Sequence, residues 1–211
     1  GSEMCIRDRN EQGEEKKMVW REKSMWMQGG KHLVLMIHPG WVKREIHYLS
    51  EYGPSFEEGK EYTIVVGPQL RDKYGRELKK EYTHKFLVGP EDRESPKLQK
   101  SCFRTLRNGS KDTLKVCFSE QMDYGTILSS MYVRGISSGG TRGVMVAAPF
   151  QLGPKTWAFV PRDKWIHGFV NLYLDNEVAD IASNHIGRKF EVTDLENFKK
   201  SKPIVVRVHI E

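Results

Sequence analysis

Two stretches of this chain follow one plan, and the second of them, Trp165 to Val192, is the clearer copy. In this stretch and in residues 56–88, a Gly precedes a strand of alternating apolar residues, and a D-x-x-small turn follows the strand. An apolar residue comes three positions after the turn, and each stretch ends in F-x-V. The turn residues match at one constant offset: Asp72, Gly75 and Leu78 correspond to Asp180, Ser183 and Ile186. Because chance rarely gives a constant offset, the sequence predicts an internal repeat.

The repeat and the residues at its turns predict an all-β chain. Short alternating segments separated by Gly, Pro, Asn and Asp are typical of antiparallel β-sandwiches. A chain of 211 residues is long enough for two ordinary domains. We therefore expect a first, shorter domain at 18–90, a linker at 91–97, and a second domain at 98–211. The linker is assigned because this stretch is polar and contains proline.

Strands are predicted wherever apolar residues alternate or form short runs bounded by turn residues. They are expected at 31–38, 61–66, 81–88, 113–118, near 131–134, at 144–152, at 156–161 and at 203–211. Residues 18–28 fit an edge strand that a Gly29-Gly30 turn joins to the next one. Residues 41–50 fit either a short amphipathic helix or a strand or loop. Between 113–118 and the strand near 131–134, only a turn is expected.

The N-terminal residues 1–17 are polar and show no apolar periodicity, so they are predicted to be disordered. Residues 1–9, GSEMCIRDR, resemble the translated read-through of a sequencing adapter. We interpret this segment as artefactual, and we expect the native start, with any export signal, to lie upstream of it.

The formal net charge is +6, but the basic residues alternate with Glu and Asp and form no long block. This pattern indicates an ordinary charged surface, and we predict no binding to nucleic acid. No apolar run approaches the roughly 20 residues that a membrane-spanning helix needs, so no membrane span is predicted.

Cys102 and Cys117 flank the turn-like sequence RNGSKD. A hairpin centred near Gly109 and Ser110 would place the two cysteines opposite each other, where a disulfide forms in an oxidising compartment. Two buried thiols on adjacent strands explain the same residues. Both alternatives stay open from the sequence.

Four pieces of the second unit occur in the order found in one family. They are FSEQMD at 118–123, WAFVP at 157–161, W-x-x-G-x-x-x-L-x-L at 165–174 and D-x-x-x-N-x-I-x-x-x-F at 180–190. In this order they resemble the bacterial Ig-like domain of the type named after the S-layer protein SbsA. Residues 31–88 are similar through G-x-x-Y-x-[IV]-x-V, D-x-x-G and the closing F-x-V, but have His38-Pro39-Gly40 where the family has F-S-x-x-M-D.

The resemblance implies tandem Ig-like antiparallel β-sandwich domains. It implies a non-catalytic structural or interaction module of a bacterial envelope or secreted protein, with no cofactor and with a protein or a cell-surface polymer as its partner. The sequence contains no G-x-S-x-G, H-E-x-x-H or P-loop motif, which agrees with a chain that is not an enzyme. Ser183 stands where the family has the Gly of a D-x-x-G-N turn, and Asn184 is expected to supply the positive φ.

Two groups of polar residues are candidates for chemistry. Asp175, Asp180 and Asn184 offer oxygen ligands for calcium, although the same residues suit a turn whose side chains bond the backbone. Glu120 and Asp123 form a possible carboxylate pair, but at a strand end they are more typical of residues that cap a turn.

An accessory carbohydrate-binding region of a secreted enzyme is the alternative function. Such a region binds sugar through exposed aromatic rings, and Trp165 is the candidate because it precedes a turn glycine. Trp157 and Phe159 lie two apart on one predicted strand and are expected in the core.

Overall fold

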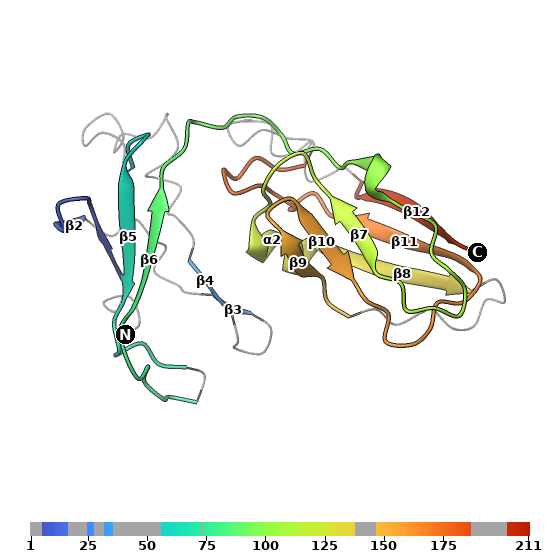
Figure 1. The fold of residues 1–211 in the computed structure, drawn as a ribbon, viewed down its shortest axis with the longest axis horizontal. Coiled ribbons are helices and arrows are strands. Elements are labelled where there is room, and N and C mark those ends of the chain that lie inside the picture. The colour runs from blue at the N-terminus through green and yellow to red at the C-terminus, as the bar shows by residue number, and fades with distance from the viewer. Residues whose placement is uncertain are drawn as a thin grey trace. The chain divides into compact units, whose positions relative to one another are not determined.

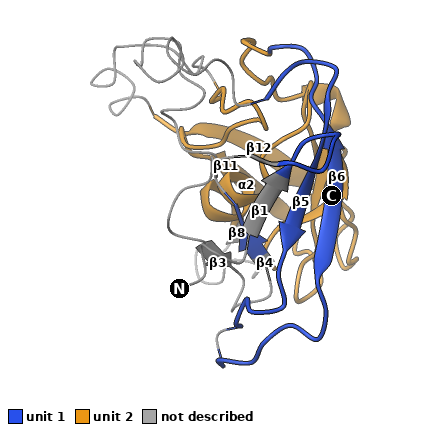
Figure 2. Ribbon diagram, turned by 90° about the vertical axis from the view of Figure 1, so that its left-hand side faces the viewer, with its two compact units in different colours: residues 1–91 blue, residues 92–211 orange. Residues whose placement is uncertain are grey.

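The computed structural model describes residues 6–16, 25–27, 32–35, 56–72, 74–137, 147–186 and 202–211. The chain divides into two compact units, residues 1–91 and residues 92–211 (Figure 2). This division lies at the start of the segment 91–97 that the sequence identifies as the linker. The predicted element at 41–50 lies outside the described residues.

Unit 1 is built on a four-stranded antiparallel sheet in the order β2-β1-β5-β6 (Figure 1). Its strands are β1 (Ile6–Arg9), β2 (Glu15–Lys16), β5 (Glu61–Val66) and β6 (Tyr82–Leu87). A separate antiparallel pair joins β3 (Met25–Met27) to β4 (His32–Val34). The predicted strands at 61–66 and 81–88 are therefore confirmed, and the expected pairing across Gly29-Gly30 is also present.

Strand β1 shows that the prediction of disorder for residues 1–17 is wrong for residues 6–16. Residues Ile6–Arg9 pair with β5 in antiparallel register, and β2 pairs with β1 in turn. Asn10 closes the turn between them, because its Oδ1 accepts the N–H groups of Gln12 and Glu14. Main-chain hydrogen bonds to the strands on both of its sides hold β1, so its sequence needs no apolar alternation.

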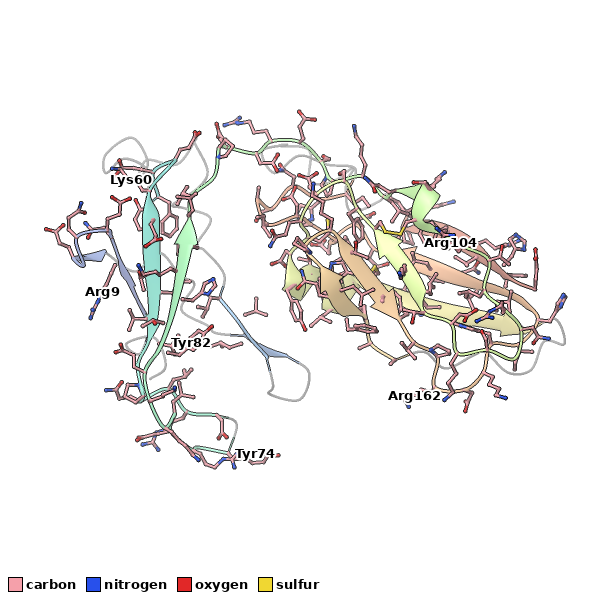
Figure 3. The ribbon with its side chains drawn as sticks, viewed as in Figure 1. Arg9, Lys60, Tyr74, Tyr82, Arg104 and Arg162 are labelled. Atoms are coloured by element: carbon pink, nitrogen blue, oxygen red, sulfur yellow. A yellow bond between two sulfur atoms is a disulfide. The ribbon has the colours of Figure 1, made fainter. Side chains whose placement is uncertain are left out.

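The core of unit 1 is small. Tyr62, Val65, Val66 and Leu70 are buried, and the ring of Tyr62 lies 5.9 Å from that of Phe86. Strand β6 is exposed at most positions. Tyr74 projects into solvent from the loop that joins β5 to β6 (Figure 3).

Unit 2 consists of two three-stranded antiparallel sheets that enclose one core (Figure 1). One sheet has the order β7-β10-β9, with β7 (Leu114–Cys117), β10 (Thr156–Phe159) and β9 (Phe150–Gly153). The other has the order β12-β11-β8, with β12 (Ile204–Ile210), β11 (Gly168–Leu174) and β8 (Met131–Ser137). The all-β prediction is confirmed, and the C-terminal strand belongs to unit 2.

Alternation along the strands explains this core. On β11, Val170, Leu172 and Leu174 are fully buried, and all three lie on one face because successive side chains point to opposite faces. Trp157 and Phe159 from β10 meet them from the other sheet within the same cluster. The predicted core position of these two aromatic residues is thus confirmed.

A short helix, α2 (Tyr124–Ser130), stands where the sequence predicts only a turn. Asp123 caps it, since its carboxylate accepts the Thr126 N–H at 2.7 Å. Ile127 anchors the helix in the core. Seven residues make only two turns, too few for helical periodicity to stand out from a strand-rich sequence. Among the described residues, no helix is long and apolar enough to cross a membrane.

A disulfide joins Cys102 to Cys117, with their Cα atoms 5.8 Å apart (Figure 3). The expected hairpin around Gly109 and Ser110 is wrong, although the cysteines do meet. Cys102 ends the 3-10 helix η3 (Lys100–Cys102) beside β7, and Leu106 then pairs in parallel with Ile210. The chain leaves one sheet for the other between the two cysteines, so the disulfide closes a loop that crosses the sandwich.

Removing the disulfide should lower the free energy of unfolding by about 3 kcal/mol, because a closed loop of about 15 residues restricts the unfolded chain. The comparison is between the Cys102→Ala, Cys117→Ala variant and the parent, both carrying Cys5→Ser to prevent exchange. Urea unfolding gives the difference. A reducing agent should bring the parent to the level of the variant and leave the variant unchanged. Equal urea midpoints for parent and variant would contradict this prediction.

Candidate functional site

The two D-x-x-small turns of the sequence repeat have the same hydrogen bonds. In unit 1 the Asp72 N–H donates to the Arg76 carbonyl at 2.9 Å, and the Arg76 N–H donates to Asp72 Oδ1 at 3.0 Å. In unit 2 the Asp180 N–H donates to the Asn184 carbonyl at 3.0 Å, and the Asn184 N–H donates to Asp180 Oδ1 at 2.9 Å. The predicted role of Asp180 and Asn184 in a turn is therefore confirmed.

The fourth residue of each turn has a left-handed backbone. Gly75 has a φ of 79° and Ser183 a φ of 68°. The expectation that Asn184 supplies the positive φ is wrong, since Ser183 itself adopts it. Ser183 is the one residue other than glycine with a positive φ in the described part of the chain. A side chain there costs about 1–2 kcal/mol relative to a right-handed conformation.

Ser183→Gly should raise the free energy of unfolding by about 0.5 kcal/mol or more. Relief of about 1–2 kcal/mol of backbone strain exceeds the roughly 0.4–1 kcal/mol that glycine adds through unfolded-state freedom. Ala182→Gly is the matched control, because Ala182 has no positive φ and should only lose stability. Urea unfolding of both variants measures whether each substitution raises or lowers the free energy of unfolding. A loss in both would show that strain at Ser183 is negligible.

The two turn aspartates differ in how their second carboxylate oxygen is used. Asp72 Oδ2 binds the Arg76 guanidinium, with distances of 2.8 Å to Nε and 2.7 Å to Nη2. In unit 2 the position of that arginine is taken by Asn184, which carries no charge. Asp180 is 1% exposed, and its buried Oδ2 has no hydrogen-bond partner among the described residues. In unit 1 an arginine of the turn itself compensates the charge of the aspartate, and in unit 2 no residue of the turn does so.

Two further carboxylates approach Asp180. Asp92, Glu120 and Asp180 each have an oxygen within 4.8 Å of the other two, and we call these three residues the carboxylate cluster. Asp92 is exposed, Glu120 is partly buried and Asp180 is buried. The cluster therefore opens to solvent on the side of Asp92 and ends in the protein interior at Asp180.

Hydrogen bonds among three separate segments build the cluster. Met122 forms an antiparallel bridge with Asp180, and the Ile181 N–H donates to the Gln121 carbonyl, which sets the chain after β7 against the turn. The Asn184 side-chain amide donates to the Asp92 carbonyl at 3.2 Å and holds the first residue of unit 2 in place. Each carboxylate thus stands on a fixed piece of backbone.

Electrostatics in the cluster are unfavourable for three ionised groups. Burial raises the pKa of Glu120 to about 7, with the hydrogen bond and charge of Asp92 and the charge of Asp180 adding to the rise. Burial also raises the pKa of Asp180, although its bonds to Asn184 oppose the shift. By contrast, the hydrogen bond from Arg76 lowers the pKa of Asp72. Carboxylates that share a site need a proton or a cation between them.

The cluster differs from both sequence hypotheses about acidic residues. Of the calcium candidates, Asp180 is a member, Asn184 supports it through the Asp92 carbonyl, and Asp175 lies outside the group. Glu120 does not pair with Asp123, because Asp123 caps α2. Asp92 was missed because it is far from the other two in sequence and lies in the expected linker.

Trp165 is buried, so the expectation that it is exposed is wrong. Its indole Nε1 donates to the Asp112 carbonyl at 2.7 Å, and its backbone bonds to Gly109 and Ser110. The loop at 109–112 covers the ring, which joins the core of the sandwich. Its indole therefore offers no open face on which a sugar could stack.

Comparison with known proteins adds no assignment: no family model matches the chain, and no curated protein matches it. The resemblance to the SbsA-type Ig-like domain stays a prediction that rests on the motifs.

Proposed function

We propose that this chain is a non-catalytic structural or interaction module of a secreted or cell-envelope protein of bacteria. The observation that carries the proposal is the disulfide between Cys102 and Cys117. Stable disulfides are typical of oxidising compartments and rare in the cytosol. A disulfide that crosses an antiparallel sandwich suits a module whose task is to stay folded outside the cell. Its partner is then another protein or a cell-surface polymer.

We further propose that the two units are tandem copies of one SbsA-type Ig-like domain. Besides the hydrogen bonds within each turn, a further pair of matching hydrogen bonds around the two turns supports this proposal. The Leu78 N–H donates to the Leu70 carbonyl at 3.2 Å, and the Ile186 N–H donates to the Val178 carbonyl at 2.8 Å. These four residues also correspond at the constant offset of the sequence repeat. A shared turn that follows a shared strand favours one ancestral domain over two unrelated ones.

The alternative, an accessory carbohydrate-binding region, has weaker support. Trp165 is buried, and the partly buried rings of Tyr132 and Tyr173 lie face to face at 5.1 Å on the β8-β11 pair. The Arg134 guanidinium lies over both of these rings, at 5.0 and 5.6 Å. Stacking on each other and on an arginine occupies ring faces that a sugar would need.

The export prediction is tested on the complete gene. We expect the complete gene to encode an export signal, and we expect the protein recovered from its source to contain the Cys102–Cys117 cross-linked peptide by mass spectrometry. A cytosolic start together with two free thiols would contradict the proposal.

A glycan array separates the two functions. We expect the full chain to bind no immobilised glycan, because Trp157 and Trp165, the two tryptophans whose burial the structure describes, are buried. Specific binding that disappears in Tyr132→Ala, while Tyr74→Ala on the exposed loop of unit 1 has no effect, would instead favour the carbohydrate-binding alternative.

A further inference from the structure

The turn of the carboxylate cluster has an uncharged residue, Asn184, where the matching turn of unit 1 has Arg76. Asp72 and Asp180 occupy the same position of the same turn, yet Arg76 forms an ion pair with Asp72, and its counterpart Asn184 has no charge to offer Asp180. A buried carboxylate without a compensating cation is costly. Unit 2 therefore retains a turn whose aspartate needs a cation from another source.

The neighbours of Asp180 make this need larger. Asp92 and Glu120 bring two more carboxylates to within 4.8 Å, and hydrogen bonds hold the segments from which both approach. Asp180 Oδ2 is buried and has no hydrogen-bond partner in the part of the chain that the structure describes, so it is the oxygen that the turn leaves available to a ligand. Three converging carboxylates, one of them with a buried oxygen that no described group bonds, have the arrangement expected of a cation site.

The donor set indicates which cation. All three side chains offer only oxygen, and the cluster contains no His or Cys, so hard cations are preferred over zinc or copper. Calcium accepts 6–8 oxygen ligands in flexible geometry, including waters, whereas magnesium demands a near-ideal octahedron. The exposed position of Asp92 admits water to complete the shell.

We propose that Asp92, Glu120 and Asp180 bind one divalent cation of the calcium class. Asp180 provides a buried ligand through Oδ2, Glu120 a second, and Asp92 a third at the open side. The ion would tie the first residue of unit 2 to the turn after β11 and to the chain after β7. This inference concerns unit 2 alone and does not depend on the proposed function or on export.

Calcium titration of the full chain tests the proposal after treatment with a chelator and dialysis, at about pH 8, where free carboxyl groups are ionised. We expect isothermal titration calorimetry to give one site per chain and the melting temperature to rise with calcium concentration. Magnesium should bind at least about tenfold more weakly because of its stricter geometry. Absence of saturable calcium binding, or tighter binding of zinc than of calcium, would overturn the assignment.

Variants distinguish a ligand from a turn residue. Asp180→Asn keeps the Oδ1 acceptor for the Asn184 N–H but removes the charge, so it should lose the calcium-dependent rise in melting temperature. In chelator it should melt no lower than the parent, whereas in calcium the parent should melt higher. Glu120→Gln, at a partly buried position outside the turn, should also weaken calcium binding at least about tenfold through the loss of a charged ligand.

Two controls are matched to these variants. Asp72→Asn makes the same change in the equivalent turn of unit 1, and Asp175→Asn changes a nearby acid outside the cluster. Both should leave the calcium affinity unchanged. If Asp180→Asn and Glu120→Gln bind calcium as tightly as the parent, or if Asp175→Asn abolishes binding, the site is not the carboxylate cluster.

Discussion

The hydrogen bonds between Asp180 and Asn184 are the interaction on which unit 2 depends. They close the turn after β11, and the turn then pairs with the chain on the other side, where the Asp123 N–H donates to the Ala179 carbonyl. Asp123 also caps α2, so the same contact fixes where the helix begins and where β8 follows it. One small turn therefore sets the positions of three segments that line the core.

The two copies of this turn show how one backbone geometry tolerates opposite electrostatics. At the surface of unit 1, Asp72 uses Oδ1 for the turn and Oδ2 for an arginine. In the interior of unit 2, Asp180 keeps the first interaction and loses the second. Because the main-chain bonds are the same, the geometry of the turn does not require the arginine. The charge of the aspartate is a separate matter: Arg76 compensates it in unit 1, whereas two further carboxylates approach it in unit 2.

Local sequence patterns predicted the parts of the fold that local forces determine. The alternation in 61–66 and 168–174 and the repeated turn were sufficient, because side-chain direction in a strand follows from neighbours in sequence. Strand β1 was missed because main-chain pairing with both of its neighbours holds it, and α2 because it is too short to show a period. The burial of Trp165 depends on a loop from another part of the chain, and Asp92 meets Asp180 only after folding. No spacing in the sequence records such long-range contacts.

The segment that enters unit 2 illustrates the same limit and unites the main features of the structure. Polar composition and proline made 91–97 look like a free linker, yet Pro96 is buried, and the backbone of Lys97 exchanges hydrogen bonds with Ser119 through both its N–H and its carbonyl. Five residues further on, the disulfide attaches Cys102 to β7. A hydrogen bond from Asn184 to the Asp92 carbonyl, hydrogen bonds at Lys97 and a covalent bond at Cys102 thus hold one continuous segment against the sandwich. The chain passes from unit 1 into unit 2 at this segment. Unit 2 therefore holds, at three points, the segment through which it is joined to unit 1.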